Sequence, residues 1–141
     1  MQRKASAVWQ GDLKTGNGTV STESGVLSQT QYSFSTRFEN GKGTNPEELI
    51  AAAHAGCFTM ALSAQLGNAG LTPEKLETTA TVTFDKLEAG WTVTKVHLSC
   101  KGKVPNADQA AWDKASDAAK AGCPISRLLN TTITLDAKLE R

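Results

Sequence analysis

Three cysteines are the residues of this sequence best suited to chemistry, and their local contexts differ. Cys123 precedes Pro124, which suits the first position of a short helix, so the thiol would lie at a helix N-terminus. Unpaired backbone N–H groups and the positive end of the helix dipole favour a thiolate there. Cys123 is therefore either a reactive thiol or a small buried residue that fills the corner between two helices.

Cys57 lies in the middle of an apolar segment that we predict to be helical. Burial raises the pKa of a thiol and makes it inert unless a cation lies against it. Arg37 and Arg127 are the candidate cations, because Arg3 and Arg141 lie near the chain ends. An arginine suits this role because it stays charged when partly buried and can bind a carboxylate and a thiolate together.

The remaining cysteine and the histidines give weaker indications of chemistry. Cys100 falls on the apolar face of a predicted strand, with no helix cap or arginine beside it in sequence, so we interpret it as a core residue. His54 and Cys57 share a helix face and could bind a metal as a pair, but a structural zinc site needs about four ligands. The chain has no CxxC pair and one other histidine, His97. Motifs of serine hydrolases, phosphate-binding loops and dinucleotide sites are absent, so we expect neither metal nor cofactor.

Length and charge narrow the classes of function. The 141 residues predict one domain over the whole chain, and 15 Lys+Arg against 14 Asp+Glu leave a net charge of +1. Nucleic acid and anionic membrane surfaces are therefore not expected as partners. The odd number of cysteines and the polar first residues predict a cytoplasmic protein. The longest apolar segment, 51–66, contains polar residues and is shorter than the about 20 residues of a membrane-spanning helix.

Residues 1–40 read as short strands separated by turns. The last of these strands is predicted from Tyr32 to Phe38, where apolar residues alternate with Ser33, Ser35 and Arg37. Arg37 would then lie on the polar face of that strand.

A long helix is predicted over about 46–67. Asn45 can serve as N-cap, Pro46 suits the first helical position and Glu48 can reach back in a capping box. The faces of this helix are nearly all small or apolar, which predicts burial all round. A chain of this length can bury such a helix only with elements on every side or with a second subunit, so we predict a dimer.

The C-terminal part alternates in long segments. A hairpin is predicted over about 78–104, a helix over about 107–121, a short helix from Pro124 and a strand over about 132–139. Strands and helices are segregated along the chain rather than alternating in βαβ units. The predicted fold class is α+β.

Four segments resemble motifs of the osmotically inducible protein C / organic hydroperoxide resistance (OsmC/Ohr) family, and specifically of its OsmC branch. They are GNGTVSTESGVL at 16–27, TNPEEL at 44–49, AHAGCF at 53–58 and AGCPIS at 121–126. The resemblance runs from about Trp9 to the C-terminus. It implies antiparallel sheets packed around a long buried central helix in an intertwined homodimer.

The resemblance also implies an activity. The family's members are thiol peroxidases that reduce organic hydroperoxides in stress defence, with an external dithiol, such as lipoyl groups, as reductant. The peroxidatic role falls on Cys57 and the resolving role on Cys123. The family's arginine and glutamate correspond to Arg37 and Glu47, and Cys100 inherits no role.

One geometric consequence concerns the distance between these residues. Glu47 and Cys57 lie ten residues apart on one predicted helix, a rise of about 15 Å. A shared arginine cannot join them within one subunit unless Arg37 spans that gap. Two copies of the helix that cross antiparallel would instead bring Glu47 of one chain near Cys57 of the other. The alternative function is a non-catalytic protein on the same fold that binds small hydrophobic ligands.

Overall fold

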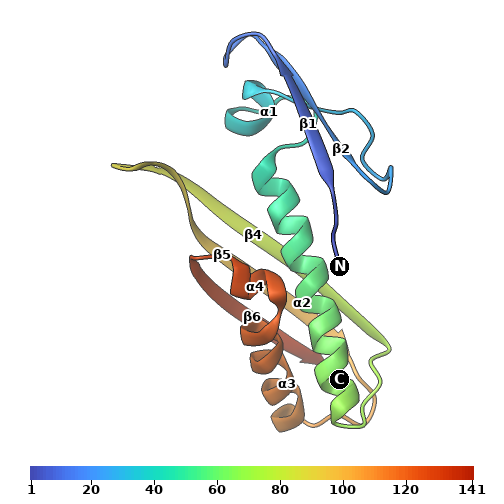
Figure 1. Ribbon diagram of the computed structural model, residues 1–141. Coiled ribbons are helices and arrows are strands. Elements are labelled where there is room, and N and C mark those ends of the chain that lie inside the picture. Colours follow the sequence, from blue (N-terminus) through green and yellow to red (C-terminus); the bar gives the residue numbers. More distant parts are fainter. The chain divides into compact units, whose positions relative to one another are not determined.

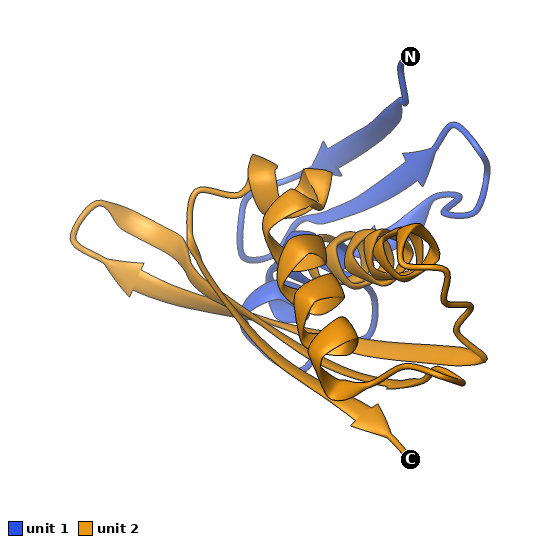
Figure 2. Cartoon of the chain, turned by 90° about the horizontal axis from the view of Figure 1, so that it is seen from below, with its two compact units in different colours: residues 1–49 blue, residues 50–141 orange.

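The computed structural model describes all 141 residues and has a mixed α+β fold, as predicted. The chain divides into two compact units, residues 1–49 and residues 50–141, which are coloured separately in Figure 2.

The first unit contains a small antiparallel sheet and a short helix. Strands β1 (Ala5–Gln10), β2 (Asn17–Thr22) and β3 (Thr30–Tyr32) pair in sequence order, and α1 (Phe34–Phe38) follows. The rings of Trp9 and Tyr32 lie 5.5 Å apart across this sheet. Gly18 lies between them, where an added Cβ would come within 2.6 Å of the Trp9 ring. Glycine is therefore required for this aromatic contact.

The prediction of a strand from Tyr32 to Phe38 is wrong after Tyr32. Ser33 ends the strand as the N-cap of α1, and its side chain and that of Thr36 form a capping box with each other's backbone N–H. The rings of Phe34 and Phe38 stack 4.8 Å apart, as residues four apart on a helix do. The spacing of the apolar residues thus fits a short helix as well as a strand. Arg37 therefore lies on α1 and not on the polar face of a strand.

Helix α2 (Pro46–Asn68) begins in the first unit and continues through the second, where it is the green helix of Figure 1. Asn45 caps it as predicted, since its side-chain oxygen accepts the backbone N–H of Glu48 at 2.8 Å. The Glu48 carboxylate does not complete the predicted capping box. It accepts instead the hydroxyl of Thr44 at 2.8 Å.

The second unit is built on the sheet β4-β5-β6. Strands β4 (Lys75–Leu87) and β5 (Gly90–Lys103) form the predicted antiparallel hairpin, and β6 (Thr132–Glu140) pairs with β5. That last pairing is parallel, contrary to the predicted antiparallel sheets and to the expected absence of βαβ units. Helices α3 (Gln109–Gly122) and α4 (Pro124–Leu128) form the crossover between the two strands (Figure 1), which a parallel pair requires.

The core of the second unit lies between the sheet and the helices. Phe58, Leu62 and Leu66 of α2 and Trp112 of α3 are completely buried. They belong to one apolar cluster with Val96, Leu98 and Cys100 of β5.

Burial of α2 on all sides is not achieved within the chain. Between the exposed Glu48 in its first turn and the exposed Asn68 at its end, the exposed residues of α2 are small or apolar: Ala52, Ala53, Gly56, Met60, Ser63, Ala64 and Gly67. The large apolar residue among them, Met60, is 78% exposed. By length and composition α2 could also cross a membrane, contrary to the expectation that its polar residues exclude this. Helices in protein cores can have the same length and apolar composition as membrane-spanning helices. One face of α2 is fully buried in the core of the second unit.

Candidate active site

The thiols of Cys57 and Cys123 lie in contact within the second unit. Cys57 is in the middle of α2, Cys123 is the N-cap of α4, and their Sγ atoms are 2.7 Å apart. Both are free thiols, and their separation exceeds the about 2.05 Å of a disulfide. Cys123 is fully buried, whereas Cys57 is partly exposed. The structure thus brings the two sequence-predicted cysteines together and leaves Cys57 the more accessible one.

The electrostatics of this pair differ from the sequence-based expectation. Burial raises the pKa of the Cys57 thiol, and its hydrogen bond with Cys123 raises it further. The backbone N–H of Ile125, in the first turn of α4, acts in the opposite direction and lowers that pKa. Cys123 makes no side-chain capping bond to α4. The N-terminus of this short helix therefore acts on Cys57, whereas the sequence had pointed to Cys123.

A second polar contact lies one helical turn from the thiols. The Nε2 atom of His54 is 2.7 Å from the Oγ atom of Ser126, and both side chains are buried. The other ring nitrogen, Nδ1, has no partner. Burial lowers the pKa of His54, which keeps the ring neutral at pH 7. No group of three or more potential metal ligands is present, so the metal pair of His54 and Cys57 has no further ligands.

Sequence reasoning missed Ser126. A signal was present, because Ser126 lies three residues after Cys123, as His54 lies three residues before Cys57. Residues three apart on a helix share a face. Two facing helices therefore could have been expected to bring both pairs together.

The first unit holds Arg37 and Glu47 as an ion pair. The Arg37 side chain donates from Nε to both carboxylate oxygens of Glu47, at 3.1 and 3.2 Å, and from Nη2 to one of them at 2.7 Å. The side chain of Glu47 is 13% exposed and that of Arg37 is 38% exposed. The guanidinium also lies 5.4 Å from the centre of the Phe38 ring. The carboxylate thus holds the guanidinium of Arg37 in place.

An apolar pocket adjoins this arginine in the same unit. It has a volume of about 280 Å³ and is lined by Trp9, Leu13, Tyr32, Ser33, Phe34, Arg37 and Phe38. Four aromatic rings therefore surround the approach to one cation. By contrast, the apolar side chains of Phe58 and Leu62 on α2 are fully buried in the core.

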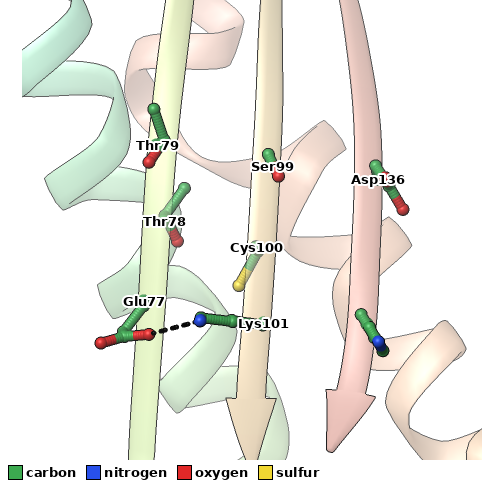
Figure 3. Close-up of a pocket in the computed structure, with 8 residues that line it drawn as sticks. Glu77, Thr78, Thr79, Ser99, Cys100, Lys101 and Asp136 are labelled. Carbon is green, nitrogen blue, oxygen red and sulfur yellow. Dashed lines mark ion pairs between the residues drawn. The ribbon is translucent and has the colours of Figure 1, made fainter.

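Cys100 lies on β5, the middle strand of the sheet of the second unit. Figure 3 shows it beside Thr78 on a sheet whose other labelled side chains are polar, with an ion pair between Glu77 and Lys101 at 3.4 Å. Cys100 is 3% exposed, and burial raises the pKa of its thiol. The depression drawn there, of about 460 Å³, contains none of the other predicted site residues. Burial and a raised pKa fit the interpretation of Cys100 as a core residue.

Comparison with known proteins identifies the family of this chain. The family model described as "OsmC-like protein" matches residues 39–138. The chain belongs to the OsmC-like family. It is 55% identical to peroxiredoxin OsmC of Escherichia coli over 140 residues, which is 99% of this chain and 98% of the relative. It is also 30% identical to an organic hydroperoxide resistance protein of Xanthomonas axonopodis over 100 residues, 67% of this chain and 68% of the relative.

Solved structures of OsmC-like proteins share the fold. An OsmC-like protein of Vibrio cholerae aligns with a TM-score of 0.79 at 18% identity and covers 97% of this chain and 99% of its own. The organic hydroperoxide resistance protein OhrB of Bacillus subtilis aligns with a TM-score of 0.67 at 22% identity, over 97% of this chain and 98% of its own. The OsmC/Ohr fold predicted from the sequence motifs is therefore confirmed.

Proposed function

We propose that this OsmC-like protein is a cysteine-based peroxidase that reduces organic hydroperoxides to alcohols. The observation that carries this proposal is the 2.7 Å contact between the Sγ atoms of Cys57 and Cys123. The full-length similarity to a peroxiredoxin supports it. Cys57 is the peroxidatic thiol, because it is partly exposed, and the buried Cys123 is the resolving thiol.

The first step consumes the hydroperoxide. The Cys57 thiolate attacks the distal oxygen, the O–O bond breaks, and the departing alkoxide takes up a proton to become the alcohol. Cys57 is left as a sulfenic acid, oxidised by two electrons, and the hydroperoxide is reduced by two electrons.

The second step protects Cys57 from further oxidation. The Cys123 thiolate attacks the sulfenic sulfur, the S–O bond breaks, and hydroxide leaves as water after taking up a proton. The product is a disulfide between Cys57 and Cys123. An external dithiol then reduces this disulfide by thiol exchange, and we propose lipoyl groups of partner proteins as its source.

The first step needs a thiolate, and the second unit supplies only part of its stabilisation. Burial raises the pKa of Cys57, and the Ile125 N–H only partly opposes this. We propose that Arg37 supplies the missing positive charge and that Glu47 holds Arg37 in place through their three hydrogen bonds. Since Glu47 and Cys57 are ten residues apart on α2, about 15 Å along its axis, the arginine would come from a partner subunit.

The exposed face of α2 supports a homodimer. Gly56 and Gly67 have open space around them, and the other exposed residues of that face are mostly small. Such a surface lets a second helix approach closely and bury apolar area, which favours association. The partner subunit's Arg37 would reach Cys57 across this interface.

The interface proposal can be tested by placing a charge on the exposed face of α2. Met60→Glu leaves the monomer core intact, because Met60 is 78% exposed, and should convert the dimer to a monomer in analytical ultracentrifugation. Val26→Glu is the matched control, since Val26 is 84% exposed but lies in the loop between β2 and β3. A Met60→Glu protein that remains dimeric and active would refute this interface.

The pocket beside Arg37 supports a preference for organic over inorganic peroxide. Apolar substituents of a hydroperoxide can occupy the aromatic pocket while its oxygens lie near the guanidinium. Trp9→Ala should reduce kcat/KM for cumene hydroperoxide and leave kcat/KM for hydrogen peroxide nearly unchanged. Equal losses with both peroxides would argue against this role of the pocket.

The alternative is a non-catalytic protein on the same fold that binds small hydrophobic ligands, and the same pocket would serve it. Mass spectrometry after treatment with cumene hydroperoxide and a thiol-blocking reagent separates the two. The peroxidase should keep only Cys100 free for blocking, whereas a binding protein would be blocked at all three cysteines. Cys123→Ser should complete one turnover and accumulate a Cys57 sulfenic acid.

We further propose a cytoplasmic role in defence against oxidative or osmotic stress. The reducing cytoplasm supplies the dithiols that reopen the disulfide and keeps Cys100 reduced. The near-neutral net charge of +1 gives no long-range attraction to nucleic acid or anionic membranes.

A further inference from the structure

Two side-chain contacts, one helical turn apart, join α2 to the start of α4. Cys57 meets Cys123, and His54, one turn earlier on α2, meets Ser126, one turn later on α4. The two segments therefore run in opposite directions where they touch. The thiol contact is reactive, whereas the His54 and Ser126 contact has no part in the peroxidase steps.

We propose that His54 and Ser126 form a latch that positions Cys123 on Cys57 for disulfide formation. This inference rests on the proposed peroxidase function, and it assigns both residues a positioning role rather than a catalytic one. The latch consists of the 2.7 Å hydrogen bond between His54 Nε2 and Ser126 Oγ.

The segment that carries Cys123 needs such a tether. Helix α4 has five residues, too few to be stable alone, and Pro124 at its start donates no backbone hydrogen bond. Cys123 itself provides no side-chain cap. Ser126 is the side chain of α4 that is buried, and its hydroxyl bonds to the long helix that carries Cys57.

Burial makes this hydrogen bond costly to lose. Both side chains lie inside the protein, and the Nδ1 atom of His54 already lacks a partner. Without Ser126 neither polar atom of the His54 ring would have a hydrogen-bond partner. The folded chain therefore favours the arrangement in which α4 is docked and Cys123 faces Cys57.

Docking of α4 matters most for the second chemical step. The first step needs Cys57 and the hydroperoxide, whereas disulfide formation needs the Cys123 sulfur aligned with the S–O bond of the sulfenic acid. Loss of alignment lowers the effective concentration of one thiol at the other. The sulfenic acid then lives longer and meets a second hydroperoxide, which oxidises it to sulfinic acid.

The test compares Ser126→Ala with Ser116→Ala in single-turnover reactions with cumene hydroperoxide. Ser116 is a matched control, because it is 2% exposed and its hydroxyl has no hydrogen-bond partner. We expect Ser126→Ala to slow conversion of sulfenic acid to disulfide about 5- to 10-fold, the effect of one lost hydrogen bond. Formation of sulfenic acid should stay unchanged, and the sulfinic acid fraction should rise.

Two results would overturn the latch. One is Ser126→Ala forming its disulfide as fast as Ser116→Ala. The other is equal slowing of both steps, which would indicate general loosening of the fold. Ser126→Thr, which keeps a hydroxyl, should restore most of the rate of disulfide formation.

A second measurement does not depend on peroxidase activity. Equilibration with reduced and oxidised glutathione forms the same disulfide by thiol exchange and reports how well the two thiols are positioned. Ser126→Ala should need an about 5- to 10-fold higher ratio of oxidised glutathione to squared reduced glutathione for half-oxidation. An unchanged ratio would contradict the latch. A wild-type protein that equilibrates normally but ignores hydroperoxides would refute the proposed function alone.

Discussion

The charged pair of residues 1–49 and the thiol pair of residues 50–141 each lack what the other has. In the first unit Arg37 is fixed by Glu47 beside an apolar pocket that contains no thiol. In the second unit the thiol of Cys57 faces that of Cys123, but burial raises the pKa of Cys57. In the proposed mechanism, placing two cysteines together and activating one of them are therefore separate tasks, carried out by separate parts of the chain.

The largest loss of activity is expected when the thiol of Cys57 is removed. Cys57→Ser should reduce hydroperoxide consumption to the rate without protein, because a serine hydroxyl is not ionised at pH 7 and forms no sulfenic acid. A coupled assay with cumene hydroperoxide and a lipoylated reductant measures this. Normal turnover by Cys57→Ser would show that the peroxidatic assignment is wrong.

Removal of the charge should have the next largest effect. Arg37→Ala should lower kcat/KM about 10- to 100-fold near pH 7 and move the pH profile upward, because the pKa of Cys57 rises when the cation is lost. Arg127→Ala is the matched control, since Arg127 is the other candidate cation and lies four residues after Cys123. A larger loss in Arg127→Ala would reassign the cation.

A smaller loss is expected when the carboxylate is neutralised. Glu47→Gln should lower kcat/KM about 3- to 10-fold, because Arg37 keeps its charge and loses only its fixed position. Glu48→Gln alters the adjacent carboxylate of α2, which accepts a hydrogen bond from Thr44, and should change kcat/KM little. Equal effects of the two variants would remove the special role of Glu47.

The pH dependence of stability tests burial in the second unit. The pKa of His54 is lowered from 6.5 by burial, so below pH 6.5 the unfolded chain binds a proton that the folded chain does not. His54 therefore contributes a loss of unfolding free energy as the pH falls below 6.5. Denaturant unfolding should show a shallower acid decline in His54→Gln than in wild type. An unchanged slope would mean that the ring binds its proton in the folded state.

The smallest effect on activity is expected at the third cysteine. Cys100→Ala should leave kcat/KM within about twofold of wild type and lower the unfolding free energy by about 1 kcal/mol. Burial raises the pKa of the Cys100 thiol from 9.0 in the wild-type protein. The thiol therefore stays protonated in the folded chain at pH values slightly above 9, where it ionises in the unfolded chain. Stability should therefore fall as the pH rises above 9, and less steeply in Cys100→Ala. A large loss of activity would give Cys100 a role in the mechanism.

Local signals in the sequence predicted the elements that carry the thiols. Asn45 and Pro46 start α2, and Pro124 starts α4 with Cys123 at its cap, because capping chemistry is local. The turn at Ser33 was missed, since apolar alternation fits both a strand and one helical turn. The parallel pairing of β6 was also missed, because the direction of a strand in a sheet depends on the connection that leads to it, here α3 and α4, and not on the strand itself.

Contacts between distant residues were less predictable. The family motifs correctly suggested that Cys57 and Cys123 meet and that Arg37 meets Glu47. The three-residue spacing from Cys123 was a signal for Ser126, but it could not be used without knowing that α4 docks on α2, since the contact with His54 depends on that docking. The pKa of Cys57 likewise depends on burial, which requires the tertiary structure.

The central claim is that each active site takes its thiols from one subunit and its arginine from the partner. Co-expression of Cys57→Ser and Arg37→Ala chains with different tags tests this most directly, because a mixed dimer then contains one intact site if the sites are shared. The account predicts that random mixtures regain about a quarter of wild-type activity, since half of the dimers are mixed and each has one of two sites. Activity no higher than that of the two variants measured separately would contradict it.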